Sequence, residues 1–314
     1  MPATLTANPV GKAMAQDLTC DLDLSLDEVV QLLDLTQMVK SSPARYAKAL
    51  SGRYLSLLFE KPSLRTRLTF ELAIKQLGGD SVSSIGPIGD REPLKDIARN
   101  LDRWTNGIIA RTFSQTTVDE LAKWSSVPVI NALTDMYHPC QVLADLYTLK
   151  EKFGQLNGLK LAFVGDGNNV AHSLMLSASR LGMAFALAHP RGYSADPEVI
   201  RQAEELAREN NTSVVITSDP EEAVSGAHAV YTDVWASMGQ ESEASRRRSD
   251  FQPYQVNEAL MAAALPEAVF MHCLPAKRGE ETTDAVMEAA NSVVFDQAEN
   301  RLHAQKALLL MMLS

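Results

Sequence analysis

Two arginines and two hydroxyl groups lie together in the run Ser63-Leu64-Arg65-Thr66-Arg67. An apolar strand-like run, Tyr54–Phe59, precedes it, and Leu64, Leu68 and Leu72 recur with the spacing of an amphipathic helix. The first N–H groups and the dipole of a helix attract an anion, and arginine can hold a phosphate through two parallel hydrogen bonds. The run therefore predicts an anion site at a helix start, with a solvated basic helix start as the alternative.

Residues far from this run could take part in the same chemistry. Arg111 ends a predicted strand, and an arginine at a buried sheet edge calls for an anionic partner. His138 precedes a helix-like run, Cys273 follows a strand-like run, and Arg301 lies on the last helix. Taken singly, each of these three has an ordinary structural interpretation. A lone histidine is more often structural than catalytic, a buried cysteine is usually a small apolar residue, and an arginine on a helix is usually a surface charge.

The run Gly165–Asn169 (GDGNN) follows a buried strand and resembles half of a dinucleotide-binding motif. The third glycine of that motif is replaced by Val170, and the next strand ends in Ala188-His189, without the carboxylate that holds a ribose. A nicotinamide enzyme is therefore a weak alternative. Asn168 and Asn169 remain available to hydrogen-bond a ligand or to cap the following helix.

The cysteines, Cys20, Cys140 and Cys273, are far apart, which gives no disulfide framework and indicates a reducing compartment. Neither His138 with Cys140 nor His272 with Cys273 has the spacing of a usual structural zinc motif. We therefore expect no metal and a cytoplasmic location.

Length and composition set broad limits on the class of protein. A chain of 314 residues with 46% hydrophobic and 22% charged residues is typical of a globular protein of two domains. Its net charge of −10 argues against a nucleic-acid partner but allows a local basic pocket for a small anion. The N-terminus has no apolar stretch of the kind in a secretory signal, and the longest apolar run, Ala307–Leu313, is too short to span a membrane.

Strand-like and helix-like runs alternate along the chain, which predicts parallel sheets covered by helices. The expected strands are Tyr54–Phe59, Ser81–Ile85, Gly107–Arg111, Val127–Ile130, Leu159–Val164, Ala184–Ala188, Ser213–Ile216, Ala229–Thr232 and Ala268–Met271. The expected helices are Leu26–Val39, Leu64–Leu77, Leu94–Trp104, Val118–Trp124, His138–Phe153, Asn169–Leu181, Pro197–Glu209, Val256–Ala264 and Ala298–Leu313. The polar stretch Gly239–Asp250 has no apolar period and is expected to be an exposed, mobile loop.

The fold class predicted is therefore α/β, with two doubly wound parallel-sheet domains. Polar groups follow the strands of both predicted sheets, and ligands of open α/β sheets bind beyond the carboxyl ends of the strands. We therefore expect an active-site cleft between the two domains.

Taken together, the motifs resemble the ornithine carbamoyltransferases, of the aspartate/ornithine carbamoyltransferase superfamily, from about residue 25 to the end of the chain. The motifs in question are SLRTR at 63–67, ART at 110–112, HPCQ at 138–141, GDGNN at 165–169, DVWASMG at 233–239, HCLP at 272–275 and AENR at 298–301. The pairing of DVWASMG with HCLP is highly specific, whereas the first motif would also fit an aspartate carbamoyltransferase.

The resemblance implies transfer of a carbamoyl group from carbamoyl phosphate to the δ-amine of L-ornithine, without metal or organic cofactor. We expect a role in arginine biosynthesis, with arginine breakdown as the open alternative. Residues 1–147, joined by the C-terminal helix 298–314, would bind carbamoyl phosphate, and residues 148–297 would bind ornithine. The chain would form a homotrimer, or a multiple of trimers, with sites at subunit contacts.

The resemblance also assigns site residues. Those expected to hold carbamoyl phosphate are Ser63, Leu64 (through its backbone), Arg65, Thr66, Arg111, His138, Gln141, Cys273, Leu274 (through its backbone) and Arg301. Arg111, His138, Cys273 and Arg301 among them would act in catalysis. Those expected to hold ornithine are Asn169, Asp233, Ser237 and Met238. Arg301 is expected to fold back to the run Ser63–Arg67.

Two positions depart from the family pattern. Leu64 stands where the family usually has threonine, and Pro87 stands where many members carry a glutamine that reaches a neighbouring active site. A proline can neither donate a hydrogen bond nor reach so far, so that contact is not expected here. The alternatives to ornithine are acetylated ornithine and aspartate, and a different class is a non-catalytic regulatory relative.

Overall fold

The computed structural model describes residues 15–60, 63–236 and 241–314. The chain divides into two compact units, which we describe separately. Unit 1 comprises Met1–Asp135 and Arg301–Ser314, and unit 2 comprises Met136–Asn300. Each unit is built on a parallel β-sheet with helices in the connections, which confirms the predicted α/β class.

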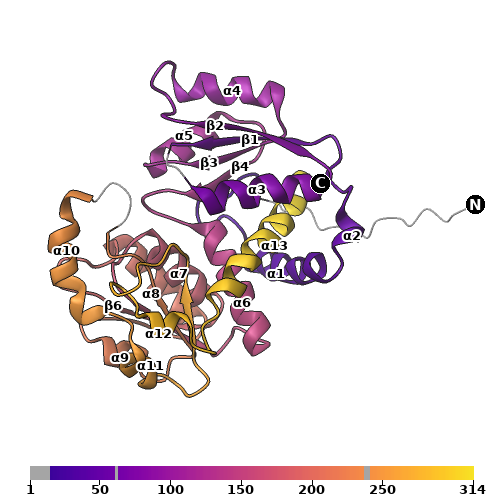
Figure 1. The fold of residues 1–314 in the computed structure, drawn as a ribbon. Helices are drawn as coiled ribbons and strands as arrows, with labels where there is room; N and C mark the ends of the chain where they lie inside the picture. Colours follow the sequence, from indigo (N-terminus) through magenta and orange to yellow (C-terminus); the bar gives the residue numbers. More distant parts are fainter. Residues whose placement is uncertain (1–14, 61–62, 237–240) are drawn as a thin grey trace, which may run out of the picture. The chain divides into compact units, whose positions relative to one another are not determined.

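Unit 1 contains a parallel sheet of four strands in the order β2-β1-β3-β4. The strands are β1 (Tyr54–Phe59), β2 (Asp80–Ile85), β3 (Gly107–Arg111) and β4 (Val129–Leu133). The helices are α1 (Leu26–Ser41), α2 (Pro43–Tyr46), α3 (Leu64–Gln76), α4 (Leu94–Trp104), α5 (Gln115–Trp124) and the larger part of α13 (Val294–Leu313). Helices α4 and α5 lie on one side of the sheet, and α1, α3 and α13 lie on the other (Figure 1).

Apolar residues from both layers hold α4 and α5 against this sheet. Ala98, Val118 and Leu121 of the helices are fully buried with Ile108 and Val129 of the strands. On the opposite side, the end of α13 reaches the sheet, because a Cβ added at Gly107 would lie 3.2 Å from a methyl group of Leu313. The terminal helix is therefore part of the unit 1 core.

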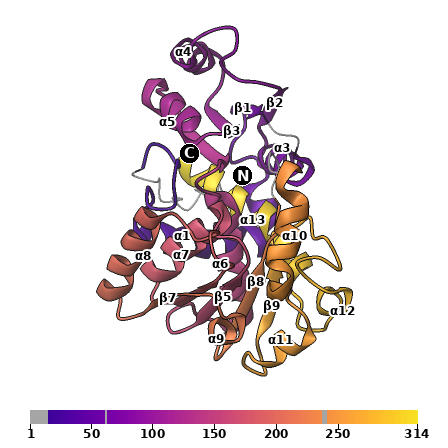
Figure 2. The ribbon, with the colours of Figure 1, turned by 90° about the vertical axis from the view of Figure 1, so that its left-hand side faces the viewer.

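Unit 2 contains a parallel sheet of five strands in the order β7-β6-β5-β8-β9. The strands are β5 (Lys160–Val164), β6 (Ala184–Ala188), β7 (Val214–Thr217), β8 (Ala229–Thr232) and β9 (Val269–His272). The helices are α6 (Pro139–Phe153), α7 (Asn169–Arg180), α8 (Pro197–Glu209), α9 (Pro220–Val224), α10 (Ala244–Phe251), α11 (Glu258–Ala262) and α12 (Asp284–Met287). Helices α7 and α8 lie on one side of the sheet, and α9 and α11 lie on the other (Figure 2).

Local sequence explains where the helices begin and end. Ser25 and Glu28 form a reciprocal capping box at the start of α1. The Asn168 side chain accepts hydrogen bonds from the first N–H groups of α7, and Asp196 does the same for α8. Helix α6 ends at Gly154, whose φ of 79° is in the left-handed region that glycine adopts without strain.

The stretch Gly239–Asp250 was predicted as an exposed, mobile loop. For its described part the loop is wrong, although most of its side chains are exposed. Glu241–Glu243 forms a turn of 3-10 helix, and Ala244–Phe251 forms α10. Phe251 is fully buried and Arg247 is only 6% exposed. The sequence shows no apolar period here because one aromatic residue and one arginine stem provide the buried face.

No helix in the described part of the chain is both long and apolar enough to cross a membrane.

Candidate active site

In unit 1 the predicted anion-binding residues flank the two central strands. From β1 the chain crosses outward to β2, and from β3 it crosses in the opposite direction to β4, so the winding reverses between β1 and β3. Ser63 follows β1 and Arg111 ends β3. The reversal point of an open parallel sheet is where ligands bind, because the connecting loops part there.

Two guanidinium groups converge on the hydroxyl of Thr66 in the first turn of α3. Arg111 Nη1 donates to Thr66 Oγ1 at 3.2 Å, and Arg301 Nη2 donates to the same oxygen at 2.7 Å. All three residues are buried, with Thr66 only 1% exposed. The prediction that Arg301 folds back to the run Ser63–Arg67 is confirmed, across 235 residues of sequence.

The other residues of the run Ser63–Arg67 place further polar groups at the start of α3. Ser63 occupies the N-cap position, but its side chain makes no capping hydrogen bond. The half-buried side chain of Arg65 makes no hydrogen bond or ion pair with any residue in the described ranges. The Leu64 side chain is 69% exposed. We call Ser63, Arg65, Thr66, Arg111 and Arg301 the unit 1 cluster.

In unit 2 the predicted residues also flank a reversal point, which lies between β5 and β8. Asn168 follows β5, and Asp233 follows β8. Asn168 Nδ2 donates to Asp233 Oδ2 at 2.8 Å while its own carbonyl oxygen caps α7. Asn169, the residue predicted as a ligand contact, is the first residue of α7. The contact with Asp233 is made by the neighbouring residue, Asn168.

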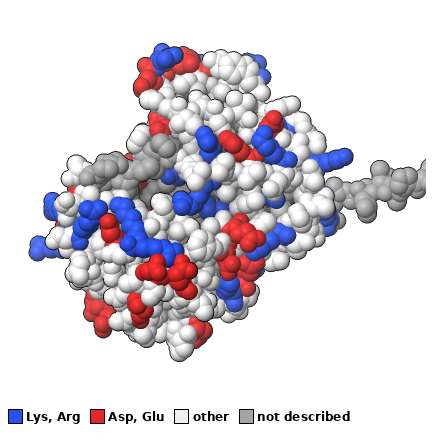
Figure 3. Space-filling view, in the orientation of Figure 1, with Lys and Arg blue, Asp and Glu red and all other residues white. Residues whose placement is uncertain are grey.

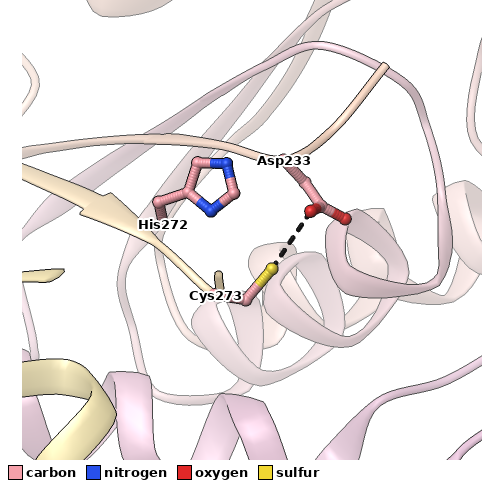
Figure 4. A group of neighbouring side chains, drawn as sticks. All are labelled: Asp233, His272 and Cys273. Atoms are coloured by element: carbon pink, nitrogen blue, oxygen red, sulfur yellow. Dashed lines mark hydrogen bonds between the residues drawn. The ribbon is translucent and has the colours of Figure 1, made fainter. Parts of the chain in front are cut away.

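Asp233 also accepts hydrogen bonds from the protein on its other oxygen. The Cys273 thiol donates to Asp233 Oδ1 at 3.1 Å (Figure 4), and the backbone N–H of Val234 donates to the same oxygen at 2.8 Å. Asp233 is 8% exposed, and Cys273 is half-buried. The carboxylate is therefore fixed in place by donors from three strand ends, and we call Asn168, Asp233, His272 and Cys273 the unit 2 cluster.

Asp233, His272 and Cys273 each have a metal-ligand atom, and these atoms lie within 4.8 Å of one another. His272, however, uses both ring nitrogens within the protein. Its Nδ1 accepts from the Leu274 N–H at 2.9 Å, and its Nε2 lies 3.1 Å from a Glu281 oxygen. A metal ion would have to displace one of these contacts. The geometry fits a hydrogen-bonded cluster, with Leu274 held at a strained φ of 58°.

His138 and Gln141 lie at the start of α6. His138 is the N-cap residue, is 4% exposed, and donates its backbone N–H to Ser173 Oγ at 2.9 Å. Gln141 is fully buried and donates its side-chain N–H to Asp145 at 2.8 Å. Both residues belong to unit 2. The predicted contacts Ser237 and Met238 lie outside the described residues.

Sequence analysis missed a buried ion pair beside the unit 2 cluster. One guanidinium nitrogen of Arg247 in α10 donates hydrogen bonds to the Asp166 carboxylate at 2.7 Å and to the Trp235 carbonyl at 2.9 Å. The same guanidinium lies 4.9 Å from the centre of the Tyr193 ring. Burial raises the pKa of the Asp166 carboxyl, and the Arg247 charge offsets only part of this effect. Arg247 therefore ties α10 to Asp166 and to Trp235, both of which precede residues 237–240 in the chain.

In the GDGNN run, the second glycine, Gly167, is required by close packing of the backbone and not by a dinucleotide. A Cβ at Gly167 would lie 2.1 Å from the backbone nitrogen of Ala195. The space that a pyrophosphate would fill beside this glycine is therefore occupied by the protein's own backbone.

Charges on the surface are mixed in sign. On the face drawn in Figure 3, the described Lys and Arg side chains lie among Asp and Glu side chains. Exposed ion pairs include Arg248 with Glu280 at 3.1 Å and Arg278 with Glu288 at 2.6 Å. Such pairs contribute little to stability, about 0–1 kcal/mol each.

Both halves of the chain match the sequence patterns of one family. Residues 16–151 match the carbamoyl-P binding domain of aspartate/ornithine carbamoyltransferase, and residues 157–312 match its Asp/Orn binding domain. A relative called ornithine carbamoyltransferase, from Thermococcus kodakarensis, is 49% identical over 299 residues, which are 94% of this chain and 95% of the relative.

Solved structures agree with this match. The chain is similar to ornithine carbamoyltransferase from Pyrococcus furiosus, with a TM-score of 0.92, 47% identity, and coverage of 95% of this chain and 97% of that one. It is also similar to an acetylornithine transcarbamylase complexed with acetylcitrulline, with a TM-score of 0.86, 32% identity, and coverage of 95% and 99%. The chain therefore belongs to the aspartate/ornithine carbamoyltransferase family.

Proposed function

We propose that this protein is an ornithine carbamoyltransferase, which transfers the carbamoyl group of carbamoyl phosphate to the δ-amine of L-ornithine and yields L-citrulline and phosphate. The observation that carries the proposal is the convergence of Arg111 and Arg301 on Thr66 at the first turn of α3. Two guanidinium groups at a helix start form a strong receptor for a phosphate. The relatives named above support the choice of reaction.

The phosphate of carbamoyl phosphate is held by the unit 1 cluster. Ser63 and Thr66 donate their hydroxyl hydrogens, Arg65 donates two N–H groups, and Leu64 contributes its backbone N–H. Thr66 can do so because its oxygen, not its hydrogen, is used by Arg111 and Arg301. The exchange of threonine for Leu64 costs little, because the side chain points to the surface.

The carbamoyl end is held by Arg111, His138, Gln141, Cys273, Arg301 and the backbone of Leu274. We keep residues 1–147, with the helix 298–314, as the carbamoyl phosphate-binding region, and the match of residues 16–151 to the carbamoyl-P binding domain supports this. Residues 148–297 then form the ornithine-binding region. Transfer requires both substrates at one reaction centre, so we propose that residues of both units serve the same pair of substrates.

The reaction needs a neutral amine, although an alkylammonium has a pKa near 10. Desolvation and nearby positive charge favour the deprotonated amine. Its attack on the carbamoyl carbon builds negative charge on the carbamoyl oxygen, which Arg111, His138 and Arg301 stabilise. Each well-placed donor contributes about 2–4 kcal/mol to such a transition state. The C–O bond to phosphate then breaks, and the amine proton goes to the leaving phosphate, so no side-chain base or cofactor is required.

Asp233 selects ornithine by pairing with its α-ammonium group, with Asn169, Ser237 and Met238 as further contacts. The positions of Asn168 and Cys273 support this role, because both hold the carboxylate in one orientation. An acetylated nitrogen carries no charge, so it gains less from a carboxylate than an ammonium group does. This argument favours ornithine over acetylornithine.

We further propose assembly as a homotrimer or a multiple of trimers. Exposed apolar side chains support it, since Leu64, Leu68 and Leu72 form a stripe on α3 and Val82 and Ile85 lie on β2. Strand β2 is an edge of its sheet, and an exposed apolar edge is usually covered in a native assembly. The three free cysteines support a cytoplasmic location, and arginine biosynthesis is the role we propose there.

A single assay tests the reaction. Purified protein is incubated with carbamoyl phosphate and ornithine, aspartate or acetylornithine, and the ureido product of each is quantified. We expect citrulline from ornithine at a rate at least about a hundredfold above the other two substrates. A preference for acetylornithine or aspartate would overturn the assignment of the substrate, and no product from any of them would overturn the proposed activity.

A further inference from the structure

A fully buried carboxylate lies one helical turn beyond Gln141 on α6. Asp145 accepts hydrogen bonds on Oδ1 from the side-chain amides of Gln141 at 2.8 Å and Gln297 at 2.7 Å. Its Oδ2 accepts from the Tyr231 hydroxyl at 3.0 Å. All four residues are at most 1% exposed and lie within unit 2.

This arrangement fixes which way each amide faces. A carboxylate only accepts, so an amide that contacts Asp145 must turn its NH2 group toward it. Gln297 is fixed a second time at its other end, because its Oε1 accepts the backbone N–H of His272 at 3.0 Å. Tyr231 is a donor for the same reason, and burial raises its pKa well above the usual range.

Gln141 is therefore left with its carbonyl facing away from Asp145. Among the residues that the structure describes, Gln141 Oε1 is buried and has no hydrogen-bond partner. A buried carbonyl without a partner costs about 1–3 kcal/mol, so this atom calls for a donor, which a ligand can supply. The i, i+4 spacing from Gln141 to Asp145 on one helix makes the orientation rigid.

We propose that Asp145 is a positioning residue that makes Gln141 an obligatory acceptor, and that this acceptor selects the NH2 group of the carbamoyl donor. The inference rests on the proposed substrate, carbamoyl phosphate, whose terminal NH2 is a donor. Acetyl phosphate has the same shape but presents a methyl group, which would leave the Gln141 carbonyl buried without a partner. Asp145 thus controls which acyl phosphate is accepted without touching it.

Two unreactive phosphonates test this directly, because they differ only at the group in question. Phosphonoacetamide carries NH2, and acetonylphosphonate carries CH3 in its place. We expect the wild-type protein to bind the amide about tenfold to a hundredfold more tightly, as measured by calorimetry. In Asp145→Asn, the new amide can donate to Gln141 Oε1 and allow Gln141 to turn over. The preference should then fall to about threefold or less. A folded Asp145→Asn protein with the wild-type preference would overturn the proposal.

Two more variants separate positioning from stability. Tyr231→Phe removes a donor from Asp145 but leaves the Gln141 contact, so it should lower the melting temperature and keep the preference. Gln141→Leu removes the acceptor, so the preference should be lost whether or not Asp145→Asn folds. Loss of the preference in Tyr231→Phe, or its survival in Gln141→Leu, would contradict the proposal.

A double variant and an activity measurement complete the design. Adding Asp145→Asn to Gln141→Leu should not change the preference further, because Asp145 acts only through Gln141. The citrulline assay on the wild-type protein tests the proposed function separately. If citrulline forms while the preference is absent or independent of Asp145, the inference fails and the proposed function stands.

Discussion

The unit 1 cluster and the unit 2 cluster hold their charged side chains in opposite ways. The unit 1 cluster brings two guanidinium groups to one neutral hydroxyl, so like charges lie close together. The unit 2 cluster holds Asp233 with an amide, a thiol and a backbone N–H. Like charges in a partly dry site repel, whereas a hydrogen-bonded carboxylate is already stabilised.

This difference indicates what each cluster does to its ligand. An anion that enters the unit 1 cluster gains charged hydrogen bonds from the arginines, so its binding is driven by charge. The unit 2 cluster presents a rigid, satisfied carboxylate, so it selects by position and by the presence of an ammonium group. Substitutions in the unit 1 cluster should therefore mainly alter affinity for the anion, and substitutions of Asp233 should mainly alter selectivity for ornithine.

The largest effect is expected from Arg247, which supports the unit 2 cluster from α10. Arg247→Met leaves the buried Asp166 carboxylate without its ion pair and should lower the free energy of unfolding by about 3–5 kcal/mol. Urea unfolding followed by tryptophan fluorescence measures this. Arg246→Met is the matched control, since the Arg246 side chain is 81% exposed and its ion pair is with the nearby Asp250 at 3.4 Å. Equal stability of the two variants would show that α10 needs no such anchor.

Asp233→Asn tests the selectivity of unit 2. The amide keeps the shape of the side chain but offers no charge to the α-ammonium of ornithine. The specificity constant, kcat/KM, for ornithine should fall by about a hundredfold or more, while the KM for carbamoyl phosphate changes little. Steady-state kinetics with each substrate varied in turn gives both values. A loss confined to carbamoyl phosphate would reverse the roles of the two clusters.

Arg65→Ala tests the unit 1 cluster. One charged hydrogen-bonding group is removed, so the affinity for carbamoyl phosphate should fall by about tenfold to a hundredfold. Inhibition by inorganic phosphate should weaken in parallel. Arg103→Ala, at an exposed arginine of the same unit, provides the control for general charge effects. Unaltered phosphate inhibition in Arg65→Ala would remove this residue from the anion site.

A smaller effect is expected at Lys306, a second kind of buried cation in unit 1. It is 3% exposed, and its side chain makes no hydrogen bond or ion pair within the described ranges. Burial lowers its pKa from 10.5, so the charged form destabilises the folded state at neutral pH. Lys306→Met should raise the free energy of unfolding by about 1 kcal/mol.

The pH dependence checks the cause of that gain. Since the folded-state pKa lies below 10.5, the penalty is present below the folded-state pKa and disappears as pH rises toward 10.5. The stability difference between Lys306→Met and the wild type should therefore shrink in alkaline urea unfolding. A constant difference would mean that packing, not charge, is responsible.

Much of the fold could be predicted from sequence because the signals were local. Strands β1, β3, β6 and β8 have the predicted bounds, since each is built on a short apolar run. The short helices α2, α9 and α12 were not predicted, because they have four or five residues and too few positions to show a period. Helix α10 was missed because Arg247 contributes to its buried face.

Some features of the candidate site could likewise be predicted from the sequence, and others could not. Positions after strand ends were predictable, since parallel strands bring their carboxyl ends to one edge. The partners of Asp145 were not, because Tyr231 and Gln297 lie on distant elements and have no motif that relates them to α6. Asn168 was considered only as a cap or a general ligand contact, and its contact with Asp233 depends on the neighbouring strand.

The division of labour between the clusters is tested most directly by titrating phosphonoacetamide into wild type, Arg65→Ala and Asp233→Asn in a calorimeter. We predict that Asp233→Asn binds this carbamoyl phosphate analogue within about threefold of wild type, and that Arg65→Ala binds it at least about tenfold more weakly. Normal binding by Arg65→Ala together with a loss in Asp233→Asn would contradict the assignment of the anion to the unit 1 cluster.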